Sequence, residues 1–354
     1  MARWACWLVL VAGIALGLAW GALHFLIVPR IDAFGPWLEQ QASQRLGVPV
    51  RLGSMVARSN GLLASLELRE VQILDTSGHA ALRLPLVLVA LSPRSVLGWG
   101  FEQLYIDGPE LEVRRSADGR IWIAGMELPT TQSNDHAAVD WLFAQPEVVL
   151  RHGILRWRDE LRNQPTLQLG EVQLILRKQY LGHHFRVDAK APAGWGTQMT
   201  LMGQFQQPLW TLRAGDWRNW VGQVFAQADH LDLAQLRNYV DLGAERDLTQ
   251  GSGSVRAWLD VDHSRITSAT ADLALQAVSA RLAADLEPLE LQRISGRLVA
   301  RQSGQGKELL AQGLSFTTRD GLHWPGGNLQ LTLTDAAAPA QPQHQPPPQT
   351  QPQT

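Results

Sequence analysis

The stretch Leu66–Leu74 reads LELREVQIL and carries the pattern that decides the fold. Leu66 and Leu68 are two residues apart, so their side chains share one face of an extended strand. Val71 breaks this alternation, and one bulge residue would return it to the face of Leu68. The same pattern, L-x-L-x-x-[VI], recurs at Leu167–Val172 and at Leu289–Ile294. The pattern alone leaves open whether this is a structural repeat or a coincidence in a leucine-rich chain.

Period-two alternation of apolar and polar residues continues from Val48 to Thr334, interrupted by turn-like stretches such as Ser59–Gly61 and Ala117–Gly119. This predicts about eighteen to twenty strands and only two or three short helices. A sheet with one apolar face must cover it, by closing into a barrel, by pairing with a second sheet, or by bending into a trough that holds a ligand. At about 4.8 Å per strand, twenty strands would form a sheet roughly 95 Å long.

The N-terminal run from Trp4 to Val28 contains no charged residue. About twenty apolar residues span a bilayer, so we expect residues 4–28 to be an uncleaved, single-pass transmembrane anchor, with residues 1–3 in the cytoplasm. Residues 29–47 are expected to contain an amphipathic helix, with Pro36 in its first turn and Gly47 at its end. Its apolar face could lie on the membrane, but we expect it to plug the end of the following sheet.

The rest of the chain divides into predicted segments by composition. Residues 48–128 are a first β-groove segment, 129–146 a loop, and 147–335 a second β-groove segment. A short helix is expected near 233–240, capped by Asp232. Residues 336–354 are rich in Pro and Gln and should be a disordered tail. The predicted fold is therefore mainly β: an N-terminal transmembrane helix, an elongated, curved antiparallel β-groove of repeating type, a few short helices and a disordered tail.

The composition argues against several function classes. With 31 Lys and Arg against 33 Asp and Glu, the net charge of −2 argues against a nucleic-acid binder. A single cysteine, Cys6, excludes an intramolecular disulfide. Asp260, Asp262 and His263 could suggest a metal site, but a solvated turn is the preferred interpretation. No hydrolase, metalloprotease or nucleotide-binding motif is present, so we predict no enzyme, no catalytic or metal-binding residues and no cofactor.

Several stretches, taken in order, resemble the AsmA-like proteins of Gram-negative bacteria, closest to the YhdP branch. They are Trp37–Leu38, Gly47–Met55, Gly61–Leu62, Leu66–Leu68, Val71–Asp75, Leu91–Leu97, Ile106–Arg115, Asp118–Gly125, Gly251–Leu259, Ala271–Leu273, Ser295–Leu298 and Asp320–Gly327. The resemblance implies a periplasmic protein anchored in the inner membrane, with a long β-groove, a role in moving phospholipid to the outer membrane and no catalytic residues. Proteins of this branch are several times longer, so the chain could be a short paralogue, a split protein or a truncated fragment.

The resulting hypothesis is a non-enzymatic protein whose apolar β-groove holds and passes phospholipid acyl chains towards the outer membrane. Its expected partners are phospholipid, the inner membrane, and an outer-membrane or periplasmic protein or a missing C-terminal part. The alternative is a periplasmic scaffold or assembly factor with a closed core, or a truncated fragment without transport. A register error of one residue would move a predicted lining residue to the other face. The candidate lining residues are Leu66, Leu68, Val71, Leu84, Leu86, Leu167, Leu169, Val172, Leu289, Leu291 and Ile294.

Overall fold

The protein is described from a computed structural model. The structure describes residues 34–60, 63–74, 80–91, 101–123, 126–127, 137–211, 213–236, 247–281, 285–303 and 306–334. Between residues 4 and 21 it describes only separate helical stretches of one to three residues. No helix formed by these residues is long and apolar enough to cross a membrane. Most of the predicted anchor and the predicted tail at 336–354 lie outside the described residues.

The described residues form one sheet of 19 strands and a few short helices. The strands are β1 (Val50–Arg51), β2 (Ser54–Asn60), β3 (Leu63–Leu74), β4 (Ala80–Leu91), β5 (Gln103–Asp107), β6 (Glu110–Arg115), β7 (Ile121–Ile123), β8 (Met126–Glu127), β9 (Glu147–Asp159), β10 (Leu167–Gln179), β11 (Gly182–Lys190), β12 (Gln198–Gln206), β13 (Val221–Asp232), β14 (Asp247–Asp262), β15 (Arg265–Arg281), β16 (Leu289–Ser303), β17 (Gly306–Thr318), β18 (His323–Trp324) and β19 (Leu329–Thr334). The helices are α2 (Gly35–Leu46), α4 (Ala137–Ala144), α5 (Leu233–Leu236) and the 3₁₀ turn η3 (Trp217–Asn219). The prediction of a mainly β chain with about this many strands is confirmed.

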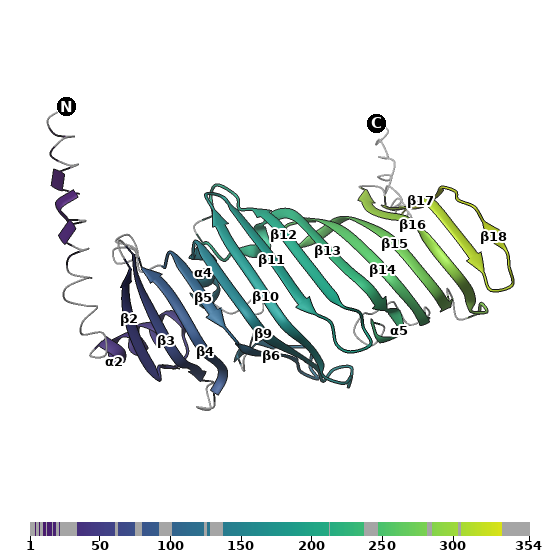
Figure 1. The fold of residues 1–354 in the computed structure, drawn as a ribbon. Coiled ribbons are helices and arrows are strands. Elements are labelled where there is room, and N and C mark those ends of the chain that lie inside the picture. Colours follow the sequence, from purple (N-terminus) through teal and green to yellow (C-terminus); the bar gives the residue numbers. More distant parts are fainter. Residues whose placement is uncertain are drawn as a thin grey trace, which may run out of the picture.

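The strands lie side by side along one long, twisted axis (Figure 1). From β9 to β17 each strand pairs antiparallel with the next one in the chain. The N-terminal end differs, because β5 and β6 both pair parallel with β9. Parallel neighbours need a crossover connection, and here it runs through β7, β8 and α4. The sheet is therefore mixed, although antiparallel pairs dominate.

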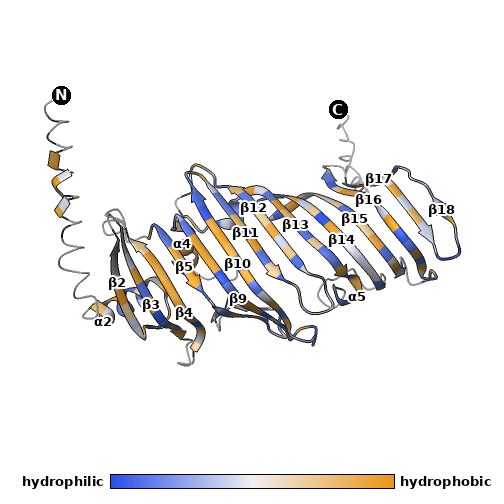
Figure 2. Cartoon of the chain, viewed as in Figure 1, coloured by the Kyte–Doolittle hydropathy of each residue, from blue (hydrophilic) through white to orange (hydrophobic). Residues whose placement is uncertain are grey.

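Directly paired residues point to the same side of a sheet, so the register identifies its two faces. Two rows of apolar residues and one glycine run across the strands from β2 to β19 on one side, which we call the apolar face. Row 1 is Ala57, Leu66, Val89, Leu104, Val148, Leu176, Phe185, Gly203, Val224, Leu259, Ala269, Ala300, Leu309 and Leu331. Row 2 is Met55, Leu68, Val87, Ile106, Leu150, Leu174, Val187, Leu201, Ala226, Ala257, Ala271, Leu298, Ala311 and Leu329. Figure 2 shows the resulting apolar and polar bands along the strands.

The repeated L-x-L-x-x-[VI] pattern coincides with interruptions of the pleat. Glu70 and Glu171 have φ angles of 54° and 48°, in the left-handed region that non-glycine residues rarely adopt. The register with β9 shifts between Leu169 and Val172, as one extra bulge residue requires. A comparable shift against β17 follows Leu291. The inferred bulge is therefore present at the second and third repeats, whereas at the first repeat the register with β4 is unshifted and only the left-handed backbone of Glu70 interrupts the pleat.

The helices partly match the sequence expectations. Pro36 lies in the first turn of α2, and Gly47 ends it with a left-handed φ of 71°. Asp232 accepts a hydrogen bond from the backbone N–H of Ala234, 2.9 Å away, so it caps α5 as predicted. The expectation of a loop over 129–146 needs correction, because residues 137–144 form α4. The apolar side chains of α4 pack against the sheet. This tertiary contact could not be inferred from the local sequence pattern.

Candidate functional site

The N-terminal portion of the apolar face is covered by helices. Leu38, Ala42 and Leu46 of α2 and Trp141, Leu142 and Phe143 of α4 pack against it. Beneath them, Leu66 and Val71 of β3 are only 5% and 6% exposed. The interpretation of the first helix as a plug on the sheet is confirmed. We call the apolar face from β1 to β12 the covered part, and fully burying each large apolar side chain there contributes about 1.5–3 kcal/mol.

An aromatic cluster of Phe143, His183, Phe185, Phe205 and Trp220 lies at the end of the covered part. The imidazole of His183 stacks on the indole of Trp220, with ring centroids 4.1 Å apart and planes 9° apart. The ring of Phe143 meets that indole edge-on, with centroids 4.9 Å apart. A Cβ atom at Gly203 would lie 2.2 Å from the ring of Phe185. Glycine at this position in row 1 therefore lets the phenylalanine ring lie against the sheet.

His183 is held neutral within this cluster. It is 1% exposed, and its Nε2 lies 3.3 Å from Oε1 of Gln207. The Gln207 amide nitrogen donates to the carbonyl oxygens of Thr211 and Arg213, which turns its oxygen towards the imidazole. Burial lowers the pKa of His183 and outweighs the opposing effect of the Gln207 hydrogen bond. The imidazole therefore contributes packing rather than charge.

Beyond β12 the same two rows continue without a helix packed over them in the part of the chain that the structure describes. Leu298 of β16 is 40% exposed and Leu309 of β17 is 42% exposed. Leu329, Leu331 and Leu333 of β19 are 55%, 53% and 49% exposed. The residues between these leucines include small ones, such as Ala269 and Ala300, whose side chains project little from the sheet. We call rows 1 and 2 from β14 to β19 the open part.

One border of the open part is closed by a second apolar cluster. Leu231 and Leu233 pack there with Val278 and Leu291, and all four are buried. Leu233 belongs to α5, so this short helix covers the ends of the strands rather than their middle. The open part is therefore a strip, bounded along one side by this cluster and exposed along its length.

The opposite face of the sheet, which we call the polar face, carries cross-strand polar pairs, and apolar residues such as Phe225, Trp258 and Val299 lie beside them. Arg297 donates two hydrogen bonds to Asp272, at 2.6 and 2.8 Å, and this guanidinium holds the pKa of the Asp272 carboxyl below its ordinary value. Gln223 and Asp260 form another cross-strand hydrogen bond of 2.9 Å. These cross-strand polar pairs therefore lie on the polar face, whereas the exposed leucines of rows 1 and 2 lie on the apolar face.

The register places ten of the eleven candidate lining residues on the apolar face. Leu66, Val71 and Leu84 are buried in the covered part, and Leu291 is buried against α5. Leu86 is the exception, because it pairs with Arg69 while its neighbour Val87 pairs with Leu68. Its assignment to the face of Leu84 needs correction: the left-handed backbone of Glu70, opposite Pro85, interrupts the alternation. Others on the apolar face are Leu68, Leu167, Leu169, Val172, Leu289 and Ile294.

The exposed leucines of rows 1 and 2 were not among the candidates. Leu298, Leu309 and Leu331 lie outside the L-x-L-x-x-[VI] repeats, and of the repeat positions only Leu289, at 40%, is comparably exposed. The alternation LQLTLT in β19 was the available signal. Asp260 and Asp262 lie at the end of β14 and His263 in the turn that follows, and no group of metal-ligating side chains gathers among the described residues.

Comparison with known proteins places the chain in a family. No curated protein and no solved structure matches it. The family model described as YhdP protein matches residues 1–345, which includes the whole sheet. With a match over nearly the full length, the chain belongs to the YhdP family.

Proposed function

We propose that this protein holds phospholipid acyl chains on the open part of its apolar face and passes them along rows 1 and 2 towards the outer membrane. The observation that carries the proposal is the exposure of Leu298, Leu309 and Leu331 on an otherwise continuous apolar face. Exposed apolar surfaces that continue over several strands mark binding sites for apolar partners. Membership of the YhdP family supports a lipid ligand, given what the resemblance implies.

The physical basis is burial of methylene groups. Each CH₂ that leaves water for an apolar surface contributes about 0.8 kcal/mol. The rows run along the long axis of the sheet, so a chain that moves by one strand spacing exchanges equivalent contacts. Its head group stays in water throughout. Transport of this kind needs no catalytic step.

The proposal includes a location. An anchor at residues 4–28 would fix the covered part beside the inner membrane and extend the sheet into the periplasm. The order of the parts supports this arrangement, because α2 and the covered part follow the apolar N-terminal run and the open part comes last. Anchoring and periplasmic exposure are tested by fusing a reporter protein, whose activity depends on the cellular compartment, to residues 336–354.

The decisive experiment is photo-crosslinking in intact cells. A photoreactive amino acid is placed at Leu309 or Leu331, on the open part, and mass spectrometry identifies what it captures. Matched controls are Glu308 and Gln330, which neighbour these residues in the same strands but lie on the polar face. Phospholipid adducts at the two leucines and none at the controls are expected. Equal adducts on both faces, or none on either, would refute the proposal.

A scaffold for a protein partner is the second candidate. It is favoured by the covered part, where α2 and α4 pack over the apolar face and bury residues such as Leu66 and Val71. The same experiment separates the two functions. Protein adducts without lipid at Leu309 and Leu331 would replace lipid transport with a scaffold.

A further inference from the structure

One border of the open part carries two polar side chains. Gln302 pairs with Lys307 across β16 and β17, and Lys307 pairs with Leu333 of β19. Ala300 and Leu309, two residues from each, belong to row 1. By the alternation of the strands, Gln302 and Lys307 therefore lie on the apolar face, next to row 1 and on the side away from α5.

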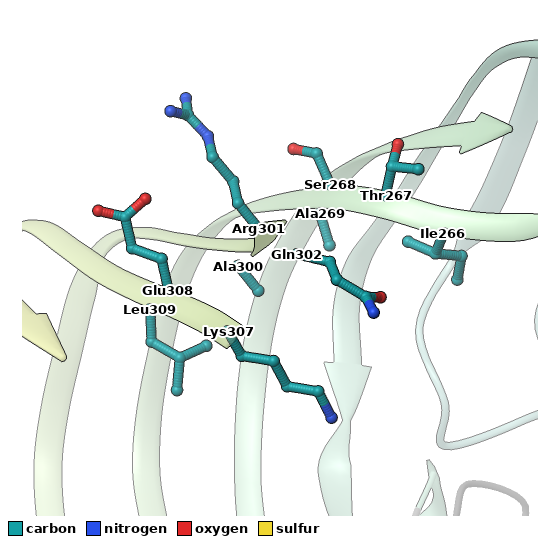
Figure 3. A pocket seen from close by; sticks show the side chains of 10 residues that line it. All are labelled: Ile266, Thr267, Ser268, Ala269, Ala300, Arg301, Gln302, Lys307, Glu308 and Leu309. Atoms are coloured by element: carbon teal, nitrogen blue, oxygen red, sulfur yellow. The ribbon is translucent and has the colours of Figure 1, made fainter. Parts of the chain in front are cut away.

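These two residues line a shallow cavity of about 180 Å³. Its apolar lining comes from Ile266, Ala269, Ala300 and Leu309. In Figure 3 these side chains project to the same side of the ribbon as Gln302 and Lys307. Arg301 and Glu308, by contrast, project to the other side. The cavity thus joins an apolar floor to one amide and one ammonium group.

The ammonium group of Lys307 is exposed beside this cavity. No carboxylate forms an ion pair with it among the described residues. Lys190 differs, since it lies 3.3 Å from Glu171. The adjacent Glu308 lies on the polar face and accepts a hydrogen bond of 2.8 Å from Gln330. Among the described residues, the ammonium group of Lys307 is therefore a cation without an ion-pair partner at the border between the apolar surface and water.

We propose that Lys307 and Gln302 bind the phosphate of a phospholipid whose acyl chains lie on rows 1 and 2. An ammonium group pairs with a phosphate oxygen by a charge-assisted hydrogen bond, and an amide N–H supplies a second donor. The apolar floor receives the first methylene groups of the acyl chains. This inference rests on the proposed function, because it supplies a head-group contact to the same lipid.

The test compares two fluorescent lipids with the same labelled acyl chain. One is phosphatidylglycerol and the other is diacylglycerol, which lacks phosphate. Their affinities for the full chain, purified in detergent, are measured by fluorescence anisotropy. We expect the wild type to prefer phosphatidylglycerol about three- to tenfold. Lys307→Gln should abolish that preference and leave diacylglycerol binding unchanged, whereas Lys307→Arg should keep most of it.

The matched control is Arg301→Gln, which removes one positive charge at the neighbouring strand on the polar face. It should leave the preference intact. Persistence of the preference in Lys307→Gln would overturn the site, and so would equal binding of both lipids by the wild type; in either case the proposed function would stand. Failure of both lipids to bind would overturn both proposals. Inorganic phosphate should not compete, and displacement of the lipid by phosphate alone would assign the site to free phosphate.

Discussion

Leu66 and Leu331 belong to the same row of the same sheet face, yet one is 5% exposed and the other 53%. The strands that carry them are built alike, with apolar residues alternating towards one side. The difference lies in the helices, because α2 and α4 cover the first and no described element covers the second. One pattern of strand residues therefore provides either a closed core or an open surface. Only the elements outside the sheet decide which.

Truncation of both side chains, Leu66 and Leu331, tests this comparison most strongly. Leu66→Ala is expected to lower the free energy of unfolding by about 2–5 kcal/mol, because it leaves a cavity beneath the helices. Leu331→Ala removes a side chain that is already half exposed, so its cost should stay within about 0.5 kcal/mol. Urea unfolding monitored by tryptophan fluorescence measures both. Equal costs would show that β19 is covered in solution.

A second substitution tests the junction between the two parts. Gly203→Ala places a methyl group against the ring of Phe185, and we expect a loss of about 1–3 kcal/mol. Gly170→Ala is the control, because a Cβ there meets no atom within 4 Å. It should be close to neutral in the same unfolding assay. A neutral Gly203→Ala would mean that the aromatic cluster is loosely packed.

A pH titration gives the smallest expected effect. The pKa of His183 is lowered in the folded protein, whereas the unfolded chain titrates near its ordinary value of about 6.5. Below that pH the unfolded state binds a proton that the folded state does not. Stability should therefore fall with decreasing pH, by at most about 1.4 kcal/mol per pH unit, until pH reaches the folded pKa.

The matched variants isolate this contribution. His183→Phe should remove the loss of stability below about pH 6.5, whereas His184→Gln, on the adjacent and opposite-facing position, should retain it. The measurement is the free energy of urea unfolding at a series of pH values. An unchanged pH dependence in His183→Phe would place the titrating group elsewhere.

The strand content of the fold could be predicted because period-two alternation is a local signal. It is set by each strand's own residues, as in Leu66 and Leu68, and does not depend on distant partners. The interruption of the pleat at Glu70 was also visible in the sequence, as a break in the alternation at Val71. The face of Leu86 could not be obtained in this way, since it depends on the backbone of Glu70 in the neighbouring strand.

The candidate site was harder to predict because exposure is a property of tertiary packing. Nothing in the sequence around Leu66 shows that α2 lies over it, and nothing around Leu331 shows that no described helix does. Gln302 and Lys307 come from adjacent strands. Their position together on the apolar face follows only from the register of β16 with β17. Local patterns therefore indicated that the sheet has an apolar face, but they did not indicate which part of that face is open.

The pairing order of the strands also has a consequence for how the chain folds. From β9 to β17 each strand needs only its predecessor, so these strands can be added one after another with little loop-closure entropy. The N-terminal end differs, because β9 must return across roughly forty residues to pair with β5 and β6. We therefore expect β5 and β6 to complete their pairing only once β9 is in place, whereas the open part can form, and can fray from its β19 edge, in single-strand steps.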